Sequence, residues 1–162
     1  MMNKYYFKKK TKAAHSEEKP YVNKTTRSKP NLVKKLDKVF SAYIRLRDVM
    51  PSGYFKCPTC GRILPFAKGD CSHYFSRTHM ATRFDEQNCC MECAYDNRMN
   101  SSHLHNLGKY LEKKLGKQGF ELLEWKHNQS KKWSDFELQA MIDYYTKEAK
   151  KLSTLKGIKV KI

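Results

Sequence analysis

The sequence lacks any apolar run that approaches the roughly 20 residues needed to cross a bilayer. Its opening stretch, MMNKYYFKKK, also lacks the apolar centre of a secretory signal peptide. Acidic residues are scarce, because 16 Asp and Glu stand against 33 Lys and Arg, for a formal net charge of +17. These absences exclude a membrane protein and predict a cytoplasmic one. The positive excess extends along most of the chain and favours a polyanion as the partner.

The chain is too short for two comfortable cores, since 162 residues match one domain of ordinary size. Residues 1–30 carry nine Lys or Arg against two Glu and show no apolar periodicity, which is typical of a disordered basic arm. Residues 31–53 are predicted to form an N-terminal helix. Apolar residues recur there at three- and four-residue intervals from Leu36 to Leu46, and Pro51 predicts the end of the helix.

The central segment, residues 54–116, is predicted to combine short strands with one helix. The stretch YFKCPTCGRILPF predicts two short strands joined by a tight turn, and DCSHYFS predicts a further strand that enters a loop. Helical spacing follows, with Gly116 as the predicted stop signal and four leucines as the predicted core face: Leu104, Leu107, Leu111 and Leu115.

The last segment, residues 117–162, is predicted to be a C-terminal helical extension. The stretch SDFE at 134–137 has the serine and glutamate of a capping box. Five apolar residues from position 136 onward are predicted to share one helical face: Phe136, Met141, Ile142, Tyr145 and Ala149.

Six cysteines in a reducing compartment indicate metal chemistry and not a disulfide framework. Cys57-Pro-Thr-Cys60-Gly is a zinc knuckle, because two thiolates three residues apart on a tight turn can hold one side of a tetrahedral Zn²⁺. The second half of the site lies near Cys93, and two pairings stay open. Cys90 repeats the CxxC spacing, whereas Asp96 offers a carboxylate as the fourth ligand.

The remaining cysteines, Cys71 and Cys89, are interpreted as small apolar residues of the core. Between the two halves of the zinc site lies the stretch DCSHYFSRTHMATRFDEQN, residues 70–88. Phosphodiester hydrolysis needs a base for water, a cation beside the leaving oxygen and positive charge around the phosphate. His73 can supply the base, a divalent ion such as Mg²⁺ the cation, and Arg77 and Arg83 the contacts to phosphate.

The order of these motifs resembles the NinG (Rap) recombination endonuclease family of phages and prophages, within the HNH or ββα-metal nucleases. The motifs are CxxCG, D-x-x-H-Y-x-S-R, R-F-D-E-x-N and a last cysteine with a nearby asparagine, and the match covers roughly residues 36–116. The resemblance implies an α+β fold. It also implies a zinc-clipped, treble-clef-like HNH core that is flanked by helices.

The resemblance further implies roles for individual residues. His73 falls on the general base, Asn88 on the asparagine that braces the loop, and Asn97 on a ligand of the catalytic Mg²⁺ or Mn²⁺, with Asp70 as a helper ligand. The chain departs from the family at three places. Asp96 stands where the fourth zinc cysteine is usual, Ser72 stands for a glycine, and Ser102-His103 stands for Gly-Asn.

The function implied is a metal-dependent DNA endonuclease in the cytosol of a bacterial host. It would cut branched recombination intermediates such as D-loops and Holliday junctions, for which a homodimer would be suited. Two alternatives stay open: a zinc-binding DNA-binding module without catalysis, and a homing or restriction HNH nuclease.

Overall fold

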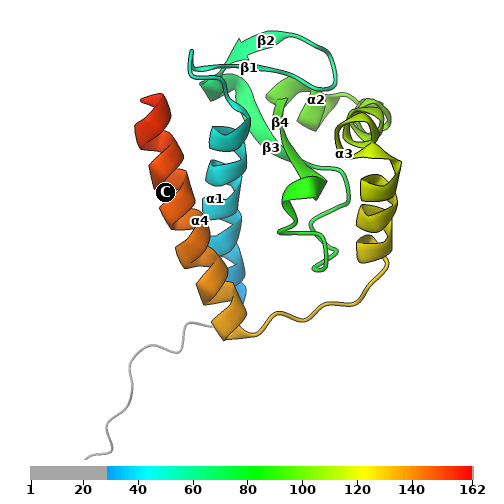
Figure 1. Ribbon diagram of the computed structural model, residues 1–162, viewed down its shortest axis with the longest axis vertical. Coiled ribbons are helices and arrows are strands. Elements are labelled where there is room, and N and C mark those ends of the chain that lie inside the picture. The colour runs from blue at the N-terminus through cyan, green and yellow to red at the C-terminus, as the bar shows by residue number, and fades with distance from the viewer. Residues whose placement is uncertain (1–28, 162) are drawn as a thin grey trace, which may run out of the picture.

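The computed structural model describes residues 29–161 and shows a mixed α+β protein with helices around two small sheets (Figure 1). The predicted basic arm lies outside the described residues, except for its last two, which begin the first helix. The elements are α1 (Lys29–Asp48), β1 (Tyr54–Lys56), β2 (Ile63–Pro65), η1 (Phe66–Lys68), β3 (Gly69–His73), η2 (Glu86–Asn88), β4 (Cys89–Cys93), α2 (Ala94–Met99), α3 (His103–His127) and α4 (Asp135–Lys156).

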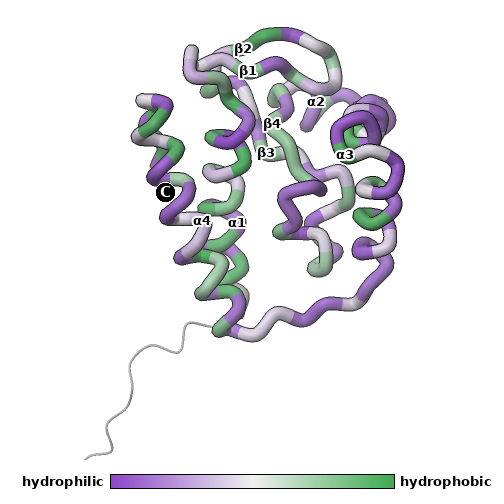
Figure 2. The backbone as a smooth tube through the Cα atoms, in the orientation of Figure 1, coloured by the Kyte–Doolittle hydropathy of each residue, from purple (hydrophilic) through white to green (hydrophobic). Residues whose placement is uncertain are grey.

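The largest core lies between α1 and α4, which run side by side although a hundred residues separate them in sequence (Figure 1). The predicted N-terminal helix and the predicted helix after the capping box are thus confirmed, and the structure shows that they pack against each other. Along both helices apolar and polar residues alternate (Figure 2), so that each buries one face. The buried residues of this core include Leu36, Phe40, Ile44, Leu138 and Ile142.

The predicted capping box at the start of α4 is confirmed. The Glu137 backbone amide donates to Ser134 Oγ at 3.2 Å, and the Ser134 amide donates to Glu137 Oε2 at 2.8 Å. The placement of Phe136 on the buried face was wrong, because its side chain is 82% exposed. Phe136 lies two residues, or about 200° of rotation, before Leu138, with which the buried stripe begins.

A lysine at the C-terminal end of α4 caps the C-terminal end of α1. Lys156 Nζ donates to the carbonyl oxygens of Leu46 at 2.7 Å and Val49 at 2.6 Å. A cation at a helix C-terminus satisfies carbonyls that have no partner within the helix. This contact holds the two helices in register at the end nearest the small sheets.

The predicted pair of strands is confirmed as the antiparallel sheet of β1 and β2, and the predicted further strand is confirmed as β3. β3 pairs antiparallel with β4, a strand that was not predicted from the sequence. In the second sheet His73 pairs with Cys89 and Ser72 with Cys90. Side chains of a strand alternate between its two faces. Cys71 and Cys89 consequently pack into the α1–α4 core, whereas Cys90 packs against α3 on the other face. Among the strands of residues 29–161, β3 pairs with β4 alone, which leaves the other edge of β3 without a strand.

Gly116 does not end the helix as the sequence predicted. It has φ 69° and ψ 168°, and α3 resumes beyond this break to His127. The glycine relieves the strain of a positive φ and so redirects the helix without stopping it. Leu107 and Leu111 are buried as expected, but Leu104 is 44% exposed, because the helix first meets the sheet one turn later. No helix within residues 29–161 has the length and apolarity to cross a membrane.

Candidate metal centre and catalytic pocket

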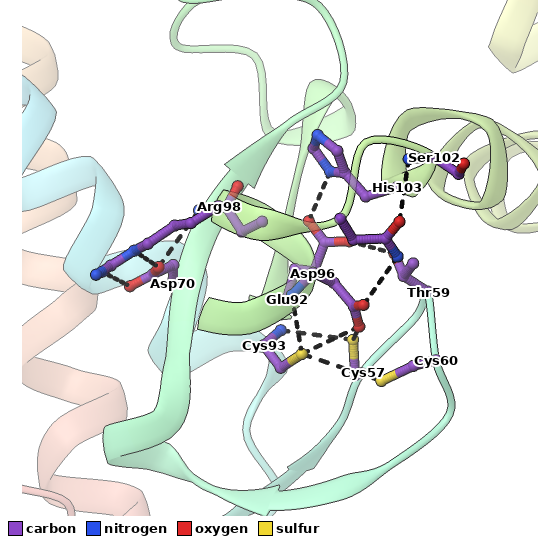
Figure 3. Close-up of polar contacts among 12 residues, drawn as sticks. Cys57, Thr59, Cys60, Asp70, Glu92, Cys93, Asp96, Arg98, Ser102 and His103 are labelled. Carbon is purple, nitrogen blue, oxygen red and sulfur yellow. Dashed lines mark hydrogen bonds and ion pairs between the residues drawn. The ribbon is translucent and has the colours of Figure 1, made fainter.

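Four side chains that could hold a metal ion meet where β1, β4 and α2 come together. Cys57, Cys60, Cys93 and Asp96 each offer one ligand atom, and these atoms lie within 4.8 Å of one another (Figure 3). Cys60 Sγ lies 4.0 Å from Cys93 Sγ, and Asp96 Oδ2 lies 3.0 Å from Cys93 Sγ. In tetrahedral zinc with Zn–S bonds of about 2.3 Å, two sulfurs lie about 3.8 Å apart. The cluster therefore has the donors and the spacing for a metal such as zinc.

The fourth member of the cluster is Asp96, and Cys90 is not part of it. Cys93 ends β4 and caps α2, its Sγ accepting from the Asp96 amide at 3.4 Å. The first turn of α2 thus brings Asp96 back to the cysteine. Cys90 sits on the opposite face of β4 beside Leu107 and Leu111. The sequence left open whether Cys90 or Asp96 completes the cluster, and the structure places Asp96 there.

The charge around this cluster suits a tightly held divalent ion. Three thiolates and a carboxylate carry more negative charge than one Zn²⁺ neutralises. The guanidinium of Arg62 lies beside them and offsets part of the excess. Its Nε donates to Cys60 Sγ at 3.2 Å and its Nη2 to Cys93 Sγ at 3.5 Å. Burial raises the pKa of the Cys57 thiol to about 12, so that metal uptake must displace its proton.

A fully buried carboxylate connects the cluster to the start of α3. Glu92 has 0% exposure, accepts a hydrogen bond from Thr59 Oγ1 in the knuckle, and lies 3.2 Å from His103 Nδ1 (Figure 3). A buried carboxylate is stable only when its oxygens are satisfied. Glu92 thereby ties the knuckle to α3. His103 is engaged in this contact and is not one of the cluster's four ligands.

A polar pocket of about 510 Å³ opens along β3, and it is lined by eight residues. They come from α1, β3, the following loop and α2: Ser41, Asp70, Cys71, His73, Ser76, Arg77, Asn97 and Arg98. Four of the predicted site residues, Asp70, His73, Arg77 and Asn97, are brought together here. Because β3 is an edge strand, side chains of both its faces reach the same opening.

His73 is oriented by a single hydrogen bond. Its Nε2 lies 3.0 Å from the carbonyl oxygen of Arg83. A carbonyl only accepts, so Nε2 carries the hydrogen of the neutral ring and Nδ1 keeps the lone pair. Burial, reinforced by the positive charge of Arg77, lowers the pKa of His73 below its ordinary value. The imidazole is thus neutral near pH 7 and able to accept a proton.

Asp70 and Asn97 lie next to each other, as a shared metal site would require. Asn97 Nδ2 donates to Asp70 Oδ2 at 3.3 Å. Arg98 forms a two-pronged pair with the same carboxylate, at 2.8 Å from Nε and 2.9 Å from Nη2 (Figure 3). Since the Arg98 side chain is 65% exposed, the pair contributes little to stability and can open at small cost.

Asn88 holds the loop that begins after His73. Its Oδ1 accepts from the Phe75 amide at 2.8 Å, and its Nδ2 donates to the carbonyl oxygens of Phe75 and Thr82, both at 3.0 Å. The side chain is fully buried and all three contacts cross the loop. Asn88 therefore lies behind the pocket, where it shapes the loop that carries Arg77 and Arg83.

The two arginines predicted to bind phosphate lie in different settings. Arg77 is exposed and lines the pocket. Arg83 is held by Asp37 of α1, with Nη2 at 2.6 Å and Nε at 3.0 Å, and it donates to the carbonyl oxygen of Arg77 at 2.7 Å. Its guanidinium is committed to these partners. A phosphate contact by Arg83 stays a prediction that would require exchange with Asp37.

Reasoning from the sequence missed several residues of these sites. Arg62, Arg98 and Glu92 were not singled out, and neither was Ser41 on α1. A basic residue beside a metal-ligating cysteine or asparagine is too common in a chain of charge +17 to carry a signal. Only the packing of α1 against β3 could have revealed Ser41.

The fold and these sites define a small α+β protein with a cysteine cluster that could hold a metal ion beside a polar pocket. The model of one protein family, described as the bacteriophage lambda NinG protein, matches residues 2–155. The chain belongs to the NinG family, which associates it with phage recombination. No curated protein and no solved structure matches the chain.

Proposed function

We propose that the protein is a metal-dependent DNA endonuclease of the HNH, ββα-metal type. The observation that carries this proposal is the pocket along β3, where a neutral imidazole, an acid–amide pair and two arginine side chains line one opening. These are the groups that phosphodiester hydrolysis requires. Membership in the NinG family supports a role in phage recombination, within which DNA cleavage would have a place.

His73 acts as the general base in this proposal. The carbonyl of Arg83 fixes the Nε2–H tautomer and turns the ring, so that Nδ1 accepts a proton from the attacking water. The lowered pKa keeps this nitrogen free of a proton at neutral pH. Arg77, at the rim of the pocket, then binds a non-bridging oxygen of the phosphate.

Asp70 and Asn97 would hold a divalent ion, Mg²⁺ or Mn²⁺, through oxygen ligands. Such an ion supplies positive charge for the leaving oxygen and for the phosphate. Arg98 must first release Asp70, which its exposure permits. Once released, Arg98 stays at the mouth of the pocket and becomes a second arginine for the phosphate backbone.

DNA would approach over α1. A neighbouring groove of about 400 Å³ shares Ser41 with the pocket and is lined by the cations Lys38, Arg45 and Lys161. Contacts of this kind neutralise phosphates and give affinity without sequence preference. Replacing Lys38 and Lys161 with Glu should weaken binding and flatten its salt dependence, whereas Lys113→Glu on α3 should change neither.

We infer branched DNA, such as D-loops and Holliday junctions, as the substrate, because phage recombination is the role that the family supports. A homodimer would place two pockets for paired cuts. In this proposal Zn²⁺ in the cluster of Cys57, Cys60, Cys93 and Asp96 is structural and ties α2 and the end of β4 to the β1–β2 connection.

The test is a cleavage assay with Mg²⁺ or Mn²⁺ on D-loops, four-way junctions and linear duplexes. Wild type should cut, and His73→Ala should lose cleavage by about 100-fold or more while it still binds DNA. The control is Asn106→Ala, an exposed residue of α3, which should cut as wild type does. Binding without cleavage by wild type in either metal would favour a zinc-binding DNA-binding module instead.

A further inference from the structure

A second group of potential metal ligands lies on the α1 side of the β3–β4 sheet. Cys71, His73 and Cys89 each offer one ligand atom, and these atoms lie within 4.8 Å of one another. The register explains their meeting, because His73 pairs directly with Cys89 and Cys71 stands two residues before His73 on the same strand face. None of the three belongs to the cluster of Cys57, Cys60, Cys93 and Asp96.

The spacing of this group is close to that of a zinc site. Ligand atoms around a tetrahedral zinc ion stand about 3.5–3.8 Å apart for sulfur and nitrogen donors. Side-chain movements of about 1 Å would therefore bring the three ligand atoms to the spacing of a zinc site. Two thiols and an imidazole are also a donor set that selects thiophilic ions over Mg²⁺. From the sequence, Cys71 and Cys89 were interpreted as small apolar residues of the core, an interpretation that does not explain why the imidazole of His73 lies beside both thiols.

The surroundings of His73 match those of a metal-bound histidine. Metal-ligating histidines donate their other ring N–H to a carboxylate or a backbone carbonyl, which fixes the ring. His73 Nε2 has this partner in the Arg83 carbonyl, at 3.0 Å, and Nδ1 keeps the lone pair.

The group is closed on the side of Cys89 and open on the side of Cys71 and His73. Cys89 has 0% exposure and closes the side toward the core. Cys71 and His73 line the polar pocket, so a fourth ligand could enter from there.

We propose that Cys71, His73 and Cys89 form a second binding site, for a thiophilic divalent cation such as Zn²⁺ or Cd²⁺, with its fourth position open to the pocket. Hard ions would instead use the oxygens of Asp70 and Asn97. One consequence rests on the proposed function. A thiophilic ion takes the lone pair of His73 Nδ1, so it blocks the general base and inhibits cleavage.

The experiment counts metal ions on the full-length, reduced protein after removal of metal and titration with Cd²⁺. Wild type should bind two Cd²⁺ by native mass spectrometry. Its thiolate-to-cadmium absorption should correspond to five thiolates, three from Cys57, Cys60 and Cys93 and two from Cys71 and Cys89. Cys89→Ala should bind one ion, with the absorption reduced to about three fifths.

Two further variants protect this result against misfolding and against a general loss of thiols. Cys71→Ala alters a half-buried residue and should give the same loss as Cys89→Ala. Cys90→Ala removes an adjacent buried thiol outside the group and should keep two ions. Saturation of wild type at one Cd²⁺, or two ions on Cys71→Ala, would overturn the proposal.

The inhibition is tested separately, with Mn²⁺-dependent cleavage under added Zn²⁺. Wild type should be inhibited at zinc concentrations that leave Cys71→Ala active. Equal inhibition of the two proteins would refute the link to His73. If the chain cuts no DNA with any metal, the proposed function fails, whereas the count of bound Cd²⁺ still decides whether the second site exists.

Discussion

Replacement of Asn88 by alanine should loosen the loop behind the pocket. The substitution removes three hydrogen bonds of a side chain that is fully buried. Thr82 is also fully buried, but its carbonyl oxygen still accepts from the Asp85 amide at 3.2 Å, so the loss of the Asn88 Nδ2 contact should cost about 0.5–1.5 kcal/mol. The amide and carbonyl of Phe75 are only half-buried and should cost about 0.5–1.5 kcal/mol each. Because water can enter the space and satisfy part of this loss, we expect a net destabilisation of about 1–3 kcal/mol.

Urea unfolding at a fixed free Zn²⁺ concentration measures the global effect of Asn88→Ala. Hydrogen exchange at the Phe75 amide measures the local one, since that proton is held at 2.8 Å by Asn88 Oδ1. The Tyr74 amide should keep its protection, because it donates to the backbone carbonyl of residue 88, which survives the substitution. Asn106→Ala, at an exposed helical position, should stay within about 0.5 kcal/mol of wild type. A loss below about 1 kcal/mol with unchanged exchange at Phe75 would refute the bracing role.

Three other predictions concern zinc, pH and the cap of α4. Asp96→Asn should weaken zinc binding more than about tenfold, because a neutral amide replaces a charged ligand, and competition with a chromophoric chelator measures this loss. The control Asp135→Asn, at an exposed position, should bind zinc as wild type does. Burial lowers the pKa of His73, so kcat/KM should fall with acid only below pH of about 6.5; an acidic midpoint above that value would contradict its role as the base. Ser134→Ala should cost about 1 kcal/mol in thermal unfolding, against no loss for Ser130→Ala.

The cap of α4 also has a pH signature with a defined sign. The Ser134 amide and hydroxyl and the ammonium of Lys131 lower the pKa of Glu137 to about 2. A carboxyl whose pKa is lowered by folding stabilises the folded state above its unfolded pKa, near 4.3. That contribution is lost as the pH falls from about 4.3 toward 2. Glu137→Gln should remove this part of the acid sensitivity, and unchanged acid unfolding would show that the capping contact contributes nothing.

The sequence by itself determined the local elements of this protein. Periodicity gave α1 and the buried stripe of α4, and the serine and glutamate at 134 and 137 gave the cap, because these signals act within one or two turns of chain. The CxxC spacing of Cys57 and Cys60 likewise indicated a metal site, because it places two thiols on one tight turn. Where the local signal was partial, the prediction failed, as for the helix end at Gly116 and the buried face at Phe136.

Only the tertiary structure decided which residues meet across the chain. Cys90 stays out of the cysteine cluster because its side chain lies on the face of β4 toward α3, and Asp96 joins the cluster because the first turn of α2 brings it back to Cys93. The pairing of β4 with β3 aligns Cys89 with His73, while α1 and α2 close the pocket from either side. Burial against a distant partner sets the register of a strand, since a shift of one residue would turn every side chain to the opposite face.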